Sequence, residues 1–180
     1  MRRLICACAA LVPLMVSACA SGGGGGTRAP VRPVAMPPAA IGVAPALAAA
    51  AYVAAAASID LFEIQSAQLA MERSRDSANR AFAQRSLRAH EGTSAQLSMA
   101  GRRLNLLPSS TLSPEHQQMI NALQAAPDFD RAYRQQQTAT LRQGIALHGS
   151  YARRGTSPTL RPVAKNAEVV MRRNQEALRR

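Results

Sequence analysis

Apolar positions recur every three or four residues from about residue 46 to the end of the chain, a spacing that predicts amphipathic α-helices. No segment shows sustained alternation of apolar and polar residues between turns, which argues against strands. Long amphipathic helices pair most simply as a bundle. The sequence therefore predicts an all-α four-helix bundle with helices over about 46–73, 77–105, 128–155 and 158–178, and a short extra helix over about 114–125.

Capping residues and prolines mark the helix boundaries. Asp76 is a predicted N-cap of the second helix, because its side chain can accept hydrogen bonds from the free N–H groups of the first turn. Ser113-Pro114 and Pro127-Asp128 mark the starts of the short helix and of the third long helix. Ser157-Pro158 opens the last helix, in which Pro162 predicts an early kink or a delayed start.

The amino-acid composition indicates which residue types build the core. Apolar residues make up 47% of the 180 residues, but aromatic residues only 3%, and Trp is absent. We therefore expect a single domain whose core is built mainly from Ala, Leu, Ile, Val and Met. The Ala-rich stretch 41–59 has some likeness to a membrane span, but Gly42, Pro45 and the weak hydrophobicity of alanine argue against a second membrane anchor.

The first residues have the order of a bacterial secretion signal. Arg2 and Arg3 precede an apolar run from Leu4 to about Val16, which is too short to span a bilayer comfortably. The run ends in Val16-Ser17-Ala18-Cys19, which resembles the lipobox, in which the cysteine thiol takes the lipid. We predict a lipoprotein signal peptide over 1–18 and lipidation of Cys19; the alternative is an ordinary cleavable signal that happens to contain a cysteine.

The segment after this signal has the composition of a linker. Residues 19–44 are rich in Gly, Pro and Ala and cannot bury enough apolar surface to order themselves, so we expect a flexible tether before a domain over 45–180. The run Gly22–Gly26 lacks the lysine and the preceding strand of a phosphate loop. Ala20 follows the predicted lipidation site in place of Asp, which by analogy with Gram-negative sorting predicts delivery to the outer membrane, facing the periplasm.

The formal net charge is +12, carried almost entirely by arginine, with Lys165 as the only lysine. Positive charge suits nucleic acid, an anionic membrane or an anionic polymer, or simply keeps helix surfaces solvated. Export and the lack of stacking aromatics argue against nucleic acid, so the expected partners are envelope proteins, anionic lipid or peptidoglycan. The cysteines are Cys6, Cys8 and Cys19, so the domain is expected to contain no disulfide.

The chain resembles one bacterial envelope family over most of its length after the tether. The resembling segments are Tyr52-Val53, Leu61-Phe62-Glu63-Ile64, Asp76, Arg80-Ala81-Phe82-Ala83-Gln84 leading to His90, Phe129-Asp130-Arg131-Ala132-Tyr133 through Gln137, and Ser157-Pro158. They resemble the family known as domain of unknown function 4142, and the run from Phe129 to Tyr133 is the most characteristic. The resemblance implies a ferritin-like four-helix bundle without implying ferritin chemistry.

Glu63, His90 and Asn174 are the polar positions expected in the interior of the bundle. Members of the resembled family commonly place a Glu on the first helix and a His on each of three later helices, and the last two positions fall here on Leu141 and Asn174. Leu cannot bind metal and Asn is a poor ligand for redox iron. We therefore expect a structural hydrogen bond between Glu63 and His90 and no cofactor; the alternative is a weakly bound transition metal, with Glu63 and His90 as ligands.

The remaining histidines carry no predicted chemistry. His116 is expected to be solvated, and His148 to stand near a helix end, where a cationic side chain interacts favourably with the helix dipole. No Ser, His and Asp occur in the strand–turn–helix context of a nucleophile, so neither catalytic residues nor enzymatic activity are predicted. The expected function is that of a lipid-anchored interaction or stress-associated module; the alternative is a degenerate ferritin-like metal-binding protein.

Overall fold

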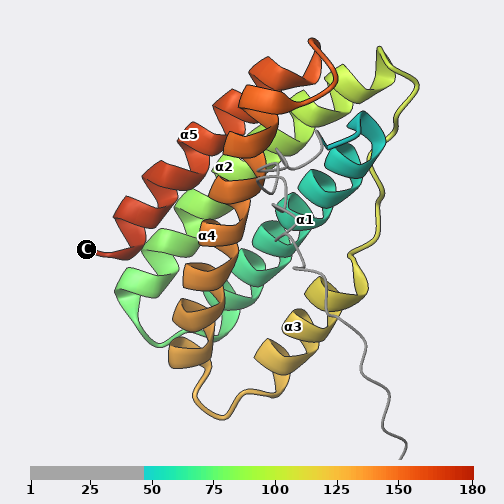
Figure 1. Ribbon diagram of the computed structural model, residues 1–180. Coiled ribbons are helices and arrows are strands. Elements are labelled where there is room, and N and C mark those ends of the chain that lie inside the picture. Colours follow the sequence, from blue (N-terminus) through green and yellow to red (C-terminus); the bar gives the residue numbers. More distant parts are fainter. Residues whose placement is uncertain (1–46) are drawn as a thin grey trace, which may run out of the picture. The chain divides into compact units, whose positions relative to one another are not determined.

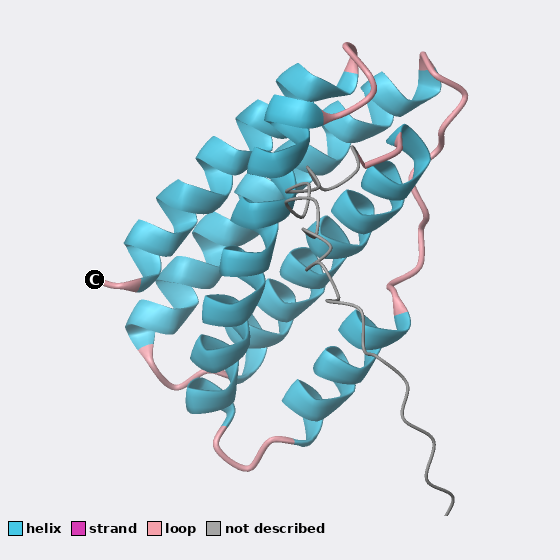
Figure 2. Ribbon diagram, in the orientation of Figure 1, coloured by secondary structure: helices cyan, strands magenta, loops and turns pink. Residues whose placement is uncertain are grey.

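The computed structural model describes residues 47–180, which form five helices and no strand (Figure 1, Figure 2). The prediction of an all-α fold with a short helix between the second and third long helices is confirmed. The predicted signal peptide 1–18, Cys19 and the tether 19–44 lie outside the described residues. The helices are α1 (Ala49–Arg73), α2 (Ser77–Arg102), α3 (Pro114–Ala125), α4 (Phe129–Arg154) and α5 (Leu160–Leu178).

The four long helices pack as an antiparallel bundle, and α3 lies beside α1 and α4 (Figure 1). Tyr52 near the start of α1 stacks on Tyr151 near the end of α4, with 3.8 Å between ring centroids. At the other end, Ser74 after α1 donates a hydrogen bond to Asp130 in the first turn of α4. The chain must therefore return along the bundle between α2 and α4, and α3 lies in that crossover. One long crossover is the connection found in ferritin-like bundles.

Three of the predicted helix starts carry side-chain caps. Asp76 accepts hydrogen bonds from two N–H groups of α2, at 2.7 and 3.4 Å, and Ser113 Oγ accepts one from α3 at 3.3 Å. Asp128 accepts one from α4 at 3.1 Å. The last helix begins at Leu160, two residues after Pro158, and Pro162 lies within its first turn.

The end of α2 turns sharply because of a glycine. The N–H groups of Leu104 and Leu106 both lie 2.9 Å from the carbonyl oxygen of Gly101, and Asn105 adopts a φ of 54°, which Asn tolerates better than most residues. A Cβ atom at Gly101 would lie 2.2 Å from the carbonyl oxygen of Leu106. Glycine thus permits the turn, which leaves Leu107 73% exposed at the end of the bundle.

The core combines the expected aliphatic residues with all six aromatic side chains of the chain. One apolar cluster surrounds Phe82 and Tyr133, and the other surrounds Tyr52 and Tyr151. Many alanines line both clusters, and their small side chains allow the helices to approach closely enough for these rings to fill the space between them.

The Ala-rich segment belongs to α1, which begins at Ala49 without a side-chain cap, slightly later than expected. Asp60 and Glu63 follow the alanines within the same helix. No helix within residues 47–180 combines the length and the apolar composition needed to cross a membrane.

Candidate functional site

A layer of buried polar side chains crosses the interior of the bundle. Along α1 and α2, these residues lie between positions that belong to the two apolar clusters. All of them are less than 5% exposed, and they come from four helices: Asp60 and Glu63 on α1, Ser86, His90 and Thr93 on α2, Gln137 on α4, and Asn174 on α5. We call this set the central polar layer.

His90 is held by Asp60 of α1. The Nδ1 atom of His90 lies 2.9 Å from Oδ1 of Asp60, and Thr93 Oγ1 donates to the same oxygen at 2.7 Å. Burial by itself lowers the pKa of His90, but the hydrogen bond to Asp60 and the charges of Glu63 and Asp60 outweigh it, so the pKa is raised. The two side chains therefore form an ion pair enclosed between α1 and α2.

Asn174 lies on the other side of the His90 ring. Its Nδ2 atom is 3.4 Å from His90 Nε2. An Asn amide offers both a donor and an acceptor, so Asn174 can partner Nε2 in either protonation state of the imidazole. Both ring nitrogens of His90 are thus engaged, and a metal could reach Nε2 only by displacing Asn174.

Glu63 does not make the expected hydrogen bond to His90, which corrects the sequence-based expectation. Its Oε2 atom accepts a hydrogen bond from Ser86 Oγ at 3.3 Å. Its Oε1 atom is buried and has no hydrogen-bond partner among the described residues. Because burial disfavours the charged form, the pKa of Glu63 is raised. Asp60, one turn earlier on α1, reaches His90 in its place.

Gln137 and Tyr133 of α4 complete this region, and neither of them is among the polar positions expected in the interior from the sequence. Gln137 Nε2 donates to Ser66 Oγ at 3.0 Å, while Gln137 Oε1 and the Tyr133 hydroxyl are buried without a partner in residues 47–180. Burial raises the pKa of Tyr133, so its hydroxyl keeps its proton. The signal for both was their four-residue spacing on α4, which places them on one inward face.

His116 is buried, with 4% of its surface exposed, and is not solvated as expected. Its Nδ1 atom lies 2.7 Å from Ser58 Oγ, and its ring stacks on Phe62 with centroids 5.2 Å apart. Burial lowers the pKa of His116. The Ser58 hydroxyl also accepts the N–H of Ser113 at 2.8 Å, and no carboxylate orients the second ring nitrogen, which is buried without a partner in this part of the chain. The arrangement fastens α3 to α1 and lacks the third member of a catalytic triad.

His148 is buried as well, at 2% exposure, which corrects its expected role as a cation at a helix end. Its Nδ1 atom lies 3.1 Å from the hydroxyl of Tyr52. Burial lowers the pKa of His148 to about 4, so the ring is neutral at pH 7. Burial also raises the pKa of Tyr52, whose hydroxyl therefore donates the hydrogen bond.

The ligands available to a metal do not form a complete site. No group of three or more His, Cys, Asp and Glu side chains within residues 47–180 is placed to hold an ion. Glu63 offers one unpartnered oxygen, whereas both nitrogens of His90 are engaged and Leu141 is fully buried in an apolar cluster. A structural zinc site has four ligands, and a catalytic one has three plus water, so the residues present do not fit a closed metal centre.

Comparison with known proteins gives a family and no function. The model of the family described as "Domain of unknown function (DUF4142)" matches residues 34–180. Neither the search of curated proteins nor that of solved structures found a match to this chain.

Proposed function

The chain belongs to the family described as domain of unknown function 4142, and we propose that this member is an exported lipoprotein, anchored through Cys19, whose helical bundle binds partners and catalyses no reaction. Its location would be the periplasmic face of the outer membrane. Its partners would be envelope proteins, anionic lipid or peptidoglycan.

The burial of the central polar layer is the observation that carries the non-enzymatic part of this proposal. Asp60, Glu63, His90 and Asn174 are between 0 and 3% exposed. A catalytic group must lie within hydrogen-bond reach of its substrate, and these side chains face only one another and the surrounding helices. Their chemistry is used to hold four helices together at one level.

The order of the segments at the start of the sequence supports the proposed lipid anchor at Cys19. The lipobox-like Val16-Ser17-Ala18-Cys19 follows a basic start and an apolar run. The cysteines of the chain all lie within its first 19 residues, so an acylated Cys19 would leave no other thiol in the exported protein. A flexible linker between a lipid and a compact bundle leaves the bundle free to meet partners near the membrane.

Cys19→Ala is expected to abolish lipid attachment. Cells grown with an alkyne-tagged fatty acid should label the wild-type protein and leave the variant unlabelled, and the variant should leave the membrane fraction. Cys8→Ala, which removes a cysteine within the signal, serves as the matched control and should be labelled like wild type. Equal labelling of wild type and Cys19→Ala would contradict the proposed anchor.

A metal-binding function is the second candidate, and the unpartnered Oε1 of Glu63 favours it. Four further buried oxygens without a partner in residues 47–180 lie on α4, and those of Gln137 and Tyr133 are two of them. Buried polar oxygens without partners are costly, and a cation held near Glu63 would relieve that cost. The engaged nitrogens of His90 oppose this function.

Metal analysis separates the two candidates. The protein is refolded with excess zinc, iron or manganese, desalted, and measured by inductively coupled plasma mass spectrometry beside Glu63→Ala/His90→Ala and the shape-conserving Glu63→Gln. We expect less than stoichiometric metal in all three proteins. Stoichiometric metal in wild type that is lost in both variants would establish the metal site and overturn the purely structural role.

A further inference from the structure

One end of the bundle carries a group of basic side chains that are not paired with a carboxylate within residues 47–180. This proximal end comprises the start of α1, the ends of α2 and α4, and the start of α5, which meet where Tyr52 stacks on Tyr151. Its basic side chains are all exposed, and none of them forms an ion pair within the described residues. They are Arg102 and Arg103 at the end of α2, Arg153 and Arg154 at the end of α4, and Arg161 and Lys165 at the start of α5.

Acidic residues are missing from the segments that build this end. No Asp or Glu occurs in 49–59, 92–103, 131–154 or 160–167. The next carboxylate along α5 is that of Glu168, which is already paired with Arg172 at 2.6 Å. At the opposite, distal end, the arginines are interspersed with acidic side chains, namely Glu72, Asp76, Asp128, Asp130 and Glu176.

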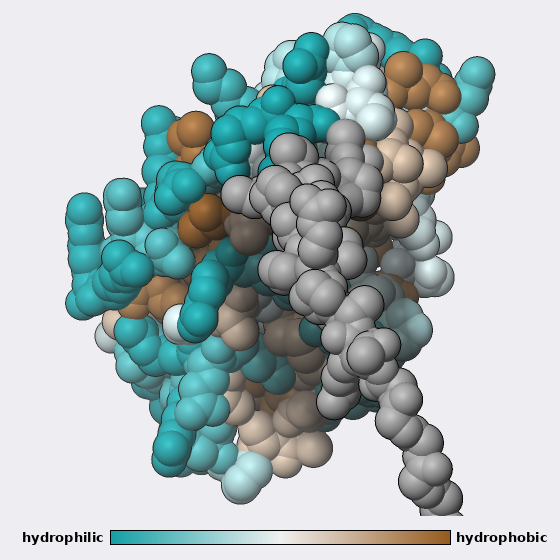
Figure 3. Space-filling model, in the orientation of Figure 1, coloured by the Kyte–Doolittle hydropathy of each residue, from teal (hydrophilic) through white to brown (hydrophobic). Residues whose placement is uncertain are grey.

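Apolar side chains are exposed among these basic residues. Of the four large hydrophobic residues exposed in residues 47–180, three lie at the proximal end: Leu47 at 38%, Met99 at 59% and Leu107 at 73% exposure. Figure 3 shows a brown surface at the upper right, over the loop that follows α2. Isolated exposed hydrophobic residues are ordinary, but here they share one end with these basic side chains.

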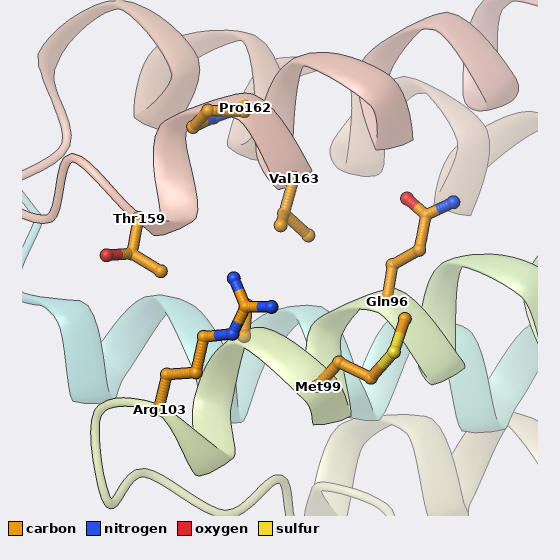
Figure 4. A pocket seen from close by; sticks show the side chains of 7 residues that line it. Gln96, Met99, Arg103, Thr159, Pro162 and Val163 are labelled. Atoms are coloured by element: carbon orange, nitrogen blue, oxygen red, sulfur yellow. The ribbon is translucent and has the colours of Figure 1, made fainter.

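A groove between α2 and α5 is lined by both basic and apolar side chains. It has a volume of about 530 Å³ and is lined by Met99 and Arg103 on one side and by Thr159, Pro162 and Val163 on the other. Figure 4 shows the guanidinium group of Arg103 rising between Met99 and Thr159 towards Val163. An anionic headgroup could meet Arg103 there while its glycerol or upper acyl carbons contact Met99 and Val163.

Basic side chains interspersed with exposed apolar ones are the usual composition of a surface that lies in a membrane interface. The segment that leads to Cys19 enters the bundle at this same end, at Ala49. We propose that the proximal end docks on the anionic phospholipid surface of the membrane that holds the lipid anchor. This inference rests on the proposed function and adds an orientation to it: the distal end faces away from the membrane and is left for other partners.

Depth-dependent quenching on the intact lipoprotein tests the orientation. The acylated protein is reconstituted in phosphatidylcholine vesicles with or without phosphatidylglycerol, and a fluorophore is attached at Met99→Cys or, as a control, at Ala78→Cys. Ala78 is also exposed and lies on the same helix, about 31 Å away along its axis. Spin-labelled lipid should quench the Met99→Cys probe several-fold more than the control in anionic vesicles, and high salt should remove the difference.

A second experiment reverses charges at the proximal or at the distal end of the bundle. Arg102→Glu/Arg103→Glu should lower quenching at Met99→Cys to the control level, whereas Arg179→Glu/Arg180→Glu at the distal end, with the same change in net charge, should leave it unchanged. Equal quenching at the two probe positions, or equal effects of the two charge reversals, would overturn the docking proposal. Flotation of the protein with the vesicles reports the anchor separately, so failure of lipidation is distinguishable from failure of docking.

Discussion

Asp60→Ala is expected to lower the free energy of unfolding by about 3–5 kcal/mol, the usual cost of removing one partner from a buried ion pair. The substitution removes the oxygen that both His90 Nδ1 and Thr93 Oγ1 contact. His90 would keep a buried donor without an acceptor, and water cannot reach it because the ring is 0% exposed. Urea unfolding at neutral pH, followed by the loss of helical circular dichroism, measures the change.

Two further variants separate charge from hydrogen bonding. Asp60→Asn keeps an oxygen for both contacts but loses the charge, so its cost should be smaller, roughly 1–2 kcal/mol. Glu63→Gln should stay within about 1 kcal/mol of wild type, because burial already favours an uncharged side chain at that position. If Glu63→Gln were as destabilising as Asp60→Ala, Glu63 would be the carboxylate that holds the layer, and the assignment of His90 to Asp60 would be wrong.

The choice between these two carboxylates shows where sequence reasoning reaches its limit. Asp60 and Glu63 are three residues apart and share one face of α1, so periodicity places both of them opposite α2. Which of them reaches His90 depends on the stagger between two helices and on the difference of one methylene group. Neither the stagger of the helices nor the reach of the side chain can be read from the spacing of the residues. From the sequence we expected Glu63 to be the hydrogen-bond partner of His90, whereas in the structure the partner is Asp60.

The helices themselves could be predicted because their signals are local. Asp76 and Ser113 cap the helices that they were expected to cap, since capping depends only on residues within one turn. The long crossover between α2 and α4 could not be read from periodicity, because the direction of a chain after a loop depends on tertiary packing. The ferritin-like connection was implied only by the family resemblance. The match over residues 34–180 confirms the family, and the crossover itself is seen only in the structure.

The two wrong histidine predictions have a common physical cause. His116 was expected to be solvated and His148 to be a cation near a helix end, because each was judged by its immediate neighbours. In α3 the buried residues are His116, Ile120 and Leu123, which are spaced by four and three residues. This spacing is typical of the buried face of an amphipathic helix. His148 similarly lies three residues before the buried Tyr151.

His148 should make the protein less stable as the pH falls from about 6.5 to about 4. Its pKa is lowered from the ordinary 6.5 to about 4 in the folded protein, first of all by burial. Between these values the unfolded chain binds a proton that the folded protein does not bind, so acid favours unfolding. The contribution of His148 to the free energy of unfolding is fully present above pH 6.5. It falls by about 3 kcal/mol as the pH approaches 4.

A comparison of wild type with His148→Asn isolates this effect, because Asn keeps an acceptor for the Tyr52 hydroxyl but does not titrate. The lowered pKa of His116 acts in the same direction and the raised pKa of Glu63 in the opposite one, whereas the raised pKa of His90 changes stability only above pH 6.5. These contributions are common to both proteins and cancel in the difference of their unfolding free energies. Urea titrations at several pH values should show that difference moving by about 3 kcal/mol in favour of His148→Asn towards pH 4. A difference that stays constant would mean that His148 titrates normally in the folded protein, and that the end of the bundle around Tyr52 is open to water.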